Sequence, residues 1–312
     1  MIQDRSRLTT ERPNPRSRDI DARSTREIVG IINAEDRRVA PAVGRQGRQI
    51  AAAVDIIVDC LRRGGRLFYV GAGTSGRLGV LDASECPPTF GVRRSMVQGI
   101  IAGGRAALVR SIEGAEDRAG DGATAIDRKK VGGRDVVVGI AACGLTPFVR
   151  AAVQRARKRG ARTVFVTCAP EAVKNIPAEV VINPVVGPEV VSGSTRMKAG
   201  TATKLVLNTL TTAAMIKLGK VHGNRMVDLR ATNDKLRDRA ERIVMEMTGL
   251  GRGSARRLLS RANGAVKVAV TMHFRNIDAA EARRLLRRCK DSLRAALVRS
   301  GGAAPRKRAS HG

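Results

Sequence analysis

Short apolar runs alternate along much of the chain with segments of helical length, and this alternation constrains the fold more than any other feature. The expected strands are the runs at 67–70, 96–102, 136–142, 163–167 and 180–182. Apolar residues at helical spacing mark the segments 48–63, 147–159 and 197–218. Strands separated by helices pair in parallel, with helices on both faces of the sheet. We therefore predict an α/β fold with a doubly wound, mostly parallel sheet, which spans 23–225 together with N-terminal helices.

The remaining segments differ from this region in composition and in hydrophobic pattern. Charged amphipathic helices are expected at 234–247, 254–262, 265–274 and 279–299, and they predict a small all-helical domain at 226–300. Residues 1–22 contain two prolines and many charges without a period, which predicts a flexible N-terminal arm that could order against a partner subunit. The small and basic residues of 301–312 predict a disordered tail.

Charge makes nucleic acid the first partner to consider, because 58 Lys and Arg against 28 Asp and Glu give a formal net charge of +30. Aromatic side chains, on which bases stack, make up only 2% of the chain. We therefore do not expect nucleic acid as a partner, although this alternative predicts DNA binding that weakens steeply with salt.

Cysteine and histidine usage indicates the compartment. The five cysteines are odd in number and contain no C-x-x-C pair, which suggests neither a disulfide framework nor a zinc site, and three scattered histidines do not suggest a metal cluster. No stretch reaches the roughly 18 apolar residues of a membrane span, and 1–20 lacks the apolar run of a signal peptide. The chain is expected in the reducing cytosol, without a membrane partner and without a metal.

A glycine-rich turn follows the first predicted strand and opens a helix, where residues 71–76 read GAGTSG. It matches the G-x-G-x-x-G of dinucleotide-binding folds, but no Asp or Glu lies between residues 86 and 112 to hold a ribose. Backbone amides and two hydroxyls at a helix N-terminus suit one phosphate monoester, so a sugar phosphate fits better than a nucleotide. A tight turn that binds nothing is the alternative.

Two further turns carry hydroxyls at the same edge of the sheet. Residues 143–147 read CGLTP after the third strand, and 192–195 read SGST before the long helix. Ligands of open α/β sheets bind at the carboxyl ends of the strands, so both turns are candidate ligand contacts.

Carboxylates come from two segments. Glu85 directly precedes an expected turn at Pro87 and Pro88, and the acidic segment 113–117 follows the second strand. If both reach one cleft, their environments can divide acid and base roles between them. On spacing alone, two solvated acids are the alternative.

These segments together resemble the N-acetylmuramic acid 6-phosphate etherase family, from about residue 20 to residue 297. The resemblance is carried by YVGAGTSGRLG at 69–79, LDASECPPTFG at 81–91, EGAED at 113–117, DVVVGI at 135–140, PVVGPEV at 184–190, STRMKAGT at 194–201, MVD at 226–228 and ATN at 231–233. It implies a sugar isomerase (SIS) fold, a small C-terminal helical domain and a homodimer. It also implies cleavage of the D-lactyl ether of the phosphosugar by elimination and then addition of water, without a metal or redox cofactor.

By this resemblance Glu85 stands at the family's proton-donor position and Glu116 at its second catalytic glutamate. We assign Glu116 to deprotonation of C2 and Glu85 to protonation of the leaving lactate oxygen. Substrate and phosphate contacts are expected at Gly73, Thr74, Ser75, Gly76, Arg77, Ser84, Thr146, Ser194 and Lys198.

One loop departs from the family, which commonly has Ser-Gly-Arg-Thr where this chain has Cys143, Gly144, Leu145 and Thr146. The change removes a hydroxyl and a cation near the expected phosphate. A non-catalytic sugar-phosphate sensor similar to the glucokinase regulatory protein is the alternative function. That regulator resembles a duplicated domain, whereas this chain has room for one, and a sensor would not need both Glu85 and Glu116.

Overall fold

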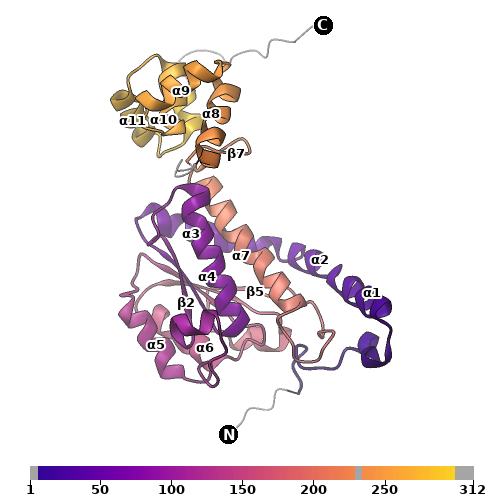
Figure 1. Cartoon of the computed structure of the whole chain (residues 1–312). Coiled ribbons are helices and arrows are strands. Elements are labelled where there is room, and N and C mark those ends of the chain that lie inside the picture. Colours follow the sequence, from indigo (N-terminus) through magenta and orange to yellow (C-terminus); the bar gives the residue numbers. More distant parts are fainter. Residues whose placement is uncertain (1–5, 229–233, 299–312) are drawn as a thin grey trace. The chain divides into compact units, whose positions relative to one another are not determined.

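The computed structural model describes residues 6–228 and 234–298 (Figure 1). Contacts divide the chain into two units, Met1–Cys86 with Arg93–Ala214 and Pro87–Val92 with Met215–Gly312. The sequence predicts the change of domain at 225/226, whereas the contacts divide the chain at 214/215. The predicted tail at 301–312 lies outside the described residues.

The first unit is built on a parallel sheet of five strands in the order β2-β1-β3-β4-β5. The strands are β1 Leu67–Gly71, β2 Val97–Ile101, β3 Val136–Ile140, β4 Arg162–Val166 and β5 Val180–Ile182. All five expected strands and the parallel arrangement are confirmed. Because β2 and β3 flank β1 on opposite sides, the chain changes direction at the carboxyl ends of β1 and β3, where open α/β sheets bind ligands.

Helices cover both faces of this sheet (Figure 1). They are α3 Gly47–Arg62, α4 Gly73–Phe90, α5 Ala119–Arg128, α6 Pro147–Lys158 and α7 Lys198–Lys217, with short 3-10 helices η3 Gly104–Leu108 and η4 Pro170–Asn175. Phe68, Val70 and Phe165 point to the face that α5 and α6 cover, where they form one buried apolar cluster. Tyr69, on the opposite face of β1, lies against α4 at Gly79.

The expected turn at Pro87 and Pro88 is wrong, because α4 continues through both prolines to Phe90. Glu85 is therefore a residue of a helix and is exposed on it. Cys86 and Pro87 are consecutive residues of α4 but belong to different units. The helix is therefore continuous across the division of the chain.

The N-terminal segment differs from the predicted flexible arm over its described residues. Short helices η1 Pro15–Ser17 and η2 Ile20–Ala22 are followed by α1 Thr25–Asp36 and α2 Val39–Gly44. Leu8 belongs to the apolar cluster under α5 and α6, and Thr10, Asn14 and Ser17 are also buried. Residues 6–22 therefore pack against their own chain, although their charge and lack of period predict a solvated segment.

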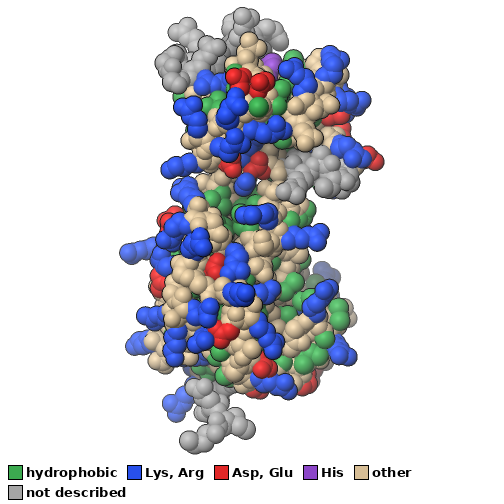
Figure 2. Space-filling model, turned by 90° about the vertical axis from the view of Figure 1, so that its left-hand side faces the viewer, with side chains coloured by type: hydrophobic (Ala, Val, Ile, Leu, Met, Phe, Trp, Pro, Cys, Tyr) green, Lys and Arg blue, Asp and Glu red, His purple; other side chains and the backbone are tan. Residues whose placement is uncertain are grey.

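The second unit contains a two-stranded ribbon and a helical bundle around one core. Its elements are β6 Val221–His222, β7 Arg225–Met226, α8 Asp234–Thr248, α9 Arg252–Arg261, α10 Val266–Arg275, α11 Ala279–Arg288 and α12 Leu293–Leu297. The single helix expected at 279–299 is wrong, because Lys290 and Asp291 adopt positive φ angles and separate α11 from α12. Across 6–228 and 234–298, no helix has the length and apolar character to cross a bilayer. Lys and Arg side chains are scattered over the face in Figure 2, with Asp and Glu among them.

Candidate active site

A cavity of about 420 Å³ opens in the first unit at the carboxyl ends of β1, β2 and β3. Its lining comprises Glu11, Ala72, Gly73, Thr74, Ser75, Arg77, Ala102, Ala107, Arg110, Ser111, Ile112, Ala115, Glu116, Ile140, Ala141, Ala142, Cys143, Thr146, Gly193 and Thr195. The cavity therefore lies at the change of strand direction, as the parallel sheet predicts. Its walls come from the glycine-rich turn, the two hydroxyl-bearing turns and the acidic segment.

The glycine-rich turn presents the N-terminus of α4 to this cavity. The first hydrogen bond of the helix runs from the Gly76 amide to the Ala72 carbonyl at 3.2 Å, so the amides of 73–75 precede it. Gly71 and Gly76 serve packing, because a Cβ on Gly71 would lie 2.6 Å from the Gly76 nitrogen. The motif thus has a structural part in these two glycines, while Gly73, Thr74 and Ser75 form a helix N-terminus of the kind that can bind an anion.

Arginine side chains line the wall beside this turn. The Arg77 guanidinium donates to the carbonyls of Leu108 and Arg110, both at 3.2 Å. Arg77 thereby fixes the loop that carries Arg110 and Ser111 into the lining. Arg110 is exposed and adds a second positive charge, which the sequence analysis did not identify.

Glu116 and Thr146 lie in the same lining, and one backbone contact connects their segments. The Phe148 amide in the first turn of α6 donates to the Glu116 carbonyl at 3.0 Å. Cys143 occupies the lining where the family has a serine, with its Sγ 4.0 Å from the Thr146 hydroxyl. Leu145 instead packs against the apolar cluster under α5 and α6.

Several expected site residues lie outside this lining. Glu85 is twelve residues beyond Gly73 on the same helix, which places it about 18 Å along the helix axis at 1.5 Å per residue. Ser84 is also exposed on α4, and its hydroxyl donates to the Leu81 carbonyl at 2.8 Å. Ser194 lies between two lining residues without being one of them. One chain therefore brings Glu116 together with the phosphate turn but leaves Glu85 outside their cavity and far along α4 from the turn.

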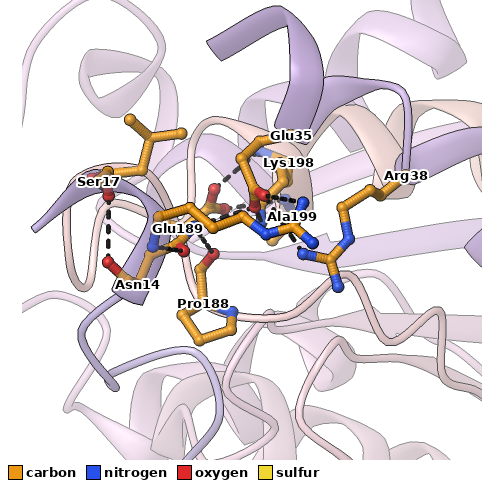
Figure 3. Close-up of polar contacts among 10 residues, drawn as sticks. Asn14, Ser17, Glu35, Arg38, Pro188, Glu189, Lys198 and Ala199 are labelled. Atoms are coloured by element: carbon orange, nitrogen blue, oxygen red, sulfur yellow. Dashed lines mark hydrogen bonds and ion pairs between the residues drawn. The ribbon is translucent and has the colours of Figure 1, made fainter. Parts of the chain in front are cut away.

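Lys198 is buried in an ion pair with Glu35 (Figure 3). It is not among the residues that line the cavity. Glu35 also accepts from Asn14 Nδ2 at 2.9 Å and from Arg38 at 3.2 Å. Burial raises the pKa of Glu35, but the hydrogen bonds from Lys198, Asn14 and Arg38 and the positive charge of Lys198 together outweigh burial and hold that pKa below its usual value. The Lys198 charge is thus balanced inside the protein, whereas Arg77 and Arg110 are among the residues that line the cavity.

Glu189 fixes the start of α7 beside the same ion pair. Its two carboxylate oxygens accept from the backbone amides of Lys198 at 3.0 Å and Ala199 at 2.9 Å (Figure 3). A carboxylate at a helix N-terminus satisfies free amides and complements the helix dipole. It holds the end of the turn that supplies Gly193 and Thr195 to the cavity.

Known proteins share the sequence pattern and the fold of the first unit. The family described as glucokinase regulatory protein N-terminal SIS domain matches residues 49–157. A solved phosphoheptose isomerase from Francisella tularensis has the same α/β fold, with a TM-score of 0.50 and 17% identity over 62% of this chain and 99% of that one.

Two relatives match over almost their whole length, and both are named N-acetylmuramic acid 6-phosphate etherase. The protein of Trichormus variabilis is 53% identical over 95% of this chain and 97% of its own. The protein of Picosynechococcus sp. is 51% identical over 94% and 97%, respectively. With half of all residues identical across both lengths, and with the SIS fold and a phosphate-type turn in place, this chain belongs to the N-acetylmuramic acid 6-phosphate etherase family.

Proposed function

We propose that this enzyme is a carbon–oxygen lyase that cleaves the D-lactyl ether of N-acetylmuramic acid 6-phosphate. The products are N-acetylglucosamine 6-phosphate and D-lactate. The observation that carries the proposal is the cavity that joins the N-terminal turn of α4 to Glu116 at the carboxyl edge of the sheet. Within one small volume it offers amide donors for a phosphate and a carboxylate for proton abstraction. The relatives at 51% and 53% identity bear the name of this activity.

In the proposed mechanism, the phosphate binds the amides of 73–75 and the hydroxyls of Thr74 and Ser75. The sugar ring opens, and Glu116 removes the C2 proton, which the neighbouring aldehyde acidifies. The resulting electron pair forms a C2–C3 double bond while the C3–oxygen bond breaks, and Glu85 protonates the departing lactate oxygen. Water then adds at C3, with Glu85 taking one of its protons and C2 regaining a proton. Glu116 and Glu85 together give and take every proton in this sequence of steps, so the proposed mechanism uses no metal or redox cofactor.

The distance between Glu85 and the phosphate turn along α4 indicates that the two belong to different sites. A hexose phosphate is shorter than the 18 Å or so that separates Glu85 from the phosphate turn of its own chain. We therefore place the proposed acid of each site on a second copy of the chain, in the homodimer that the resemblance implies. Leu81 and Leu205, exposed on α4 and α7, are apolar side chains that such an association would cover.

The test is incubation of the purified protein with N-acetylmuramic acid 6-phosphate in deuterated and in oxygen-18 water. We expect D-lactate release, deuterium at C2 and oxygen-18 at C3 of the sugar. Glu116→Gln is expected to abolish both turnover and C2 exchange while substrate still binds. Glu113→Gln is the matched control, because this exposed neighbour lies outside the lining and pairs with the Ser111 hydroxyl at 2.6 Å. Wild-type C2 exchange in Glu116→Gln would remove Glu116 from the role of base.

A non-catalytic phosphosugar sensor predicts a different result in this experiment, because the sugar would raise the melting temperature without release of lactate. The match to a regulatory SIS domain covers only residues 49–157, whereas the etherases match over nearly the whole chain. The proposal also includes the reducing cytosol as the compartment, in keeping with five free cysteines.

A further inference from the structure

The N-terminal segment brings a second carboxylate, that of Glu11, to the cavity that contains Glu116. Its Oε2 atom lies beside Gly193, where an added Cβ would come within 3.1 Å of it. Gly193 has a φ of +74°, so this turn favours glycine for its backbone and has no side chain to compete with the Glu11 carboxylate. Glu11 is partly buried, between a solvated charge and a core residue.

Contacts on both sides of Glu11 hold it in this place. Before it, Leu8 packs in the apolar cluster and the Thr9 hydroxyl donates to Glu171 at 2.6 Å. After it, Asn14 donates to Glu35 at 2.9 Å and to the Pro188 carbonyl at 3.1 Å. Ser17 completes the attachment by donating to the Val190 carbonyl at 2.7 Å. Figure 3 shows Asn14, Ser17 and Pro188 beside the ion pair of Glu35 and Lys198.

This attachment ties the wall formed by Glu11 to the buried ion pair. Glu35 holds Asn14 of the N-terminal segment and Lys198 of α7, whose preceding turn carries Gly193. The N-terminal segment and the turn before α7 are thus both fixed to Glu35, and the Glu11 side chain extends from the segment to Gly193 of the turn. A carboxylate that is fixed on both sides binds a ligand group at a smaller cost in side-chain entropy than a mobile one does.

The chemistry of a carboxylate limits what Glu11 can contact. It accepts hydrogen bonds from neutral donors and repels a phosphate dianion within the same small cavity. An N-acetylated hexose phosphate carries both kinds of group, because its hydroxyls and amide N–H are donors and its phosphate is an anion. The amides of 73–75 attract the phosphate, and Glu11 suits the sugar portion of the same molecule.

We propose that Glu11 is a substrate-binding residue that accepts a hydrogen bond from a hydroxyl or the amide N–H of the sugar. It thereby orients the sugar with its phosphate on the N-terminus of α4. The identity of the sugar rests on the proposed function. The role of Glu11 rests on the lining of the cavity and extends the site to a segment for which the sequence predicts no structure.

The experiment compares wild type with Glu11→Gln, which removes the charge at nearly constant size. Asp21→Asn is the matched control, because it makes the same type of change at an exposed position of the same segment. Calorimetry measures binding of N-acetylglucosamine 6-phosphate and, separately, of inorganic phosphate, and kinetics measure KM and kcat for the lactyl ether. A charge-assisted hydrogen bond is worth roughly a tenfold to hundredfold change in affinity. We expect a loss of this size for the sugar phosphate and a matching rise in KM, while the phosphate affinity does not fall, because the repulsion by Glu11 is removed, and the Asp21→Asn values stay near wild type.

Two results would overturn the role of Glu11. Unchanged sugar phosphate affinity in Glu11→Gln would show that the carboxylate does not contact the sugar. An equal loss for sugar phosphate and inorganic phosphate, with a lower melting temperature, would show that Glu11 only supports the fold. Because the binding assay requires no turnover, absence of lactate release by wild type would contradict the proposed function separately from the role of Glu11.

Discussion

Asp82 is a buried acid whose ionisation is expected to cost the folded protein stability. It lies on α4 one turn before Glu85, is 8% exposed and accepts from the Thr211 hydroxyl at 3.1 Å through Oδ1. Its other oxygen, Oδ2, makes no hydrogen bond of ordinary geometry among the described residues, and the buried Tyr69 hydroxyl lies nearby. Burial raises the pKa of Asp82 from 3.8 to about 6.

The sign of the pH dependence follows from this raised pKa. Below about pH 4 both the folded and the unfolded chain hold the proton, so Asp82 has no effect. Between pH 4 and pH 6 the unfolded chain loses its proton first, and the free energy of unfolding falls as the pH rises. Above pH 6 the loss of stability is complete. The pKa of Asp82 differs by about two units between the unfolded and the folded chain, which at 1.36 kcal/mol per unit amounts to about 3 kcal/mol.

Asp82→Asn is expected to remove this loss, because Asn keeps an oxygen for Thr211 and carries no charge. Urea unfolding followed by circular dichroism should show a stability gain of about 3 kcal/mol at pH 8 that shrinks toward zero near pH 4. Asp55→Asn, at an exposed position of α3, is the control and should change little at any pH. A gain that is equal at pH 4.5 and pH 8 would refute the reasoning, since the effect would then not come from ionisation. Destabilisation at pH 8 would show instead that the Asp82 charge is stabilising.

Two further perturbations test other parts of the molecule. Lys198→Met leaves Glu35 without its buried partner and is expected to lower the free energy of unfolding by about 3 kcal/mol near neutral pH; a stability equal to wild type in denaturant melts would mean that Arg38 and Asn14 suffice. Mixing Glu85→Gln with Glu116→Gln under conditions of subunit exchange is expected to restore lactate release, because a mixed dimer holds one site with both glutamates intact. Failure of the mixture, in samples shown by mass spectrometry to contain mixed dimers, would argue that both glutamates of a site belong to one chain.

The candidate site was only partly predictable from the sequence. Residues 73–75 and Arg77 begin the helix after β1, Thr146 lies in the turn after β3, and Glu116 lies in the connection between β2 and α5. The carboxyl ends of parallel strands meet at one edge, so the order of the elements was enough to bring these connections together. Glu85 was expected directly before a turn, since two prolines usually end a helix, but α4 continues past them, and Glu85 lies in the helix, away from the phosphate turn. Lys198 was expected at the phosphate because it belongs to a segment that carries the family resemblance and could supply a cation there, whereas its charge is taken by Glu35, 163 positions away.

The sequence by itself determined the parallel sheet, the helices beside it and the edge at which the cavity opens. These features depend on the periodicity of apolar residues and on turn chemistry, which act over a few neighbouring positions. Only the tertiary structure decided that Glu11 borders the cavity, that Asn14 and Lys198 share Glu35, and that the helix expected at 279–299 breaks in two. The pairing of charges from distant segments depends on which of them are buried together, and no spacing along the chain encodes that.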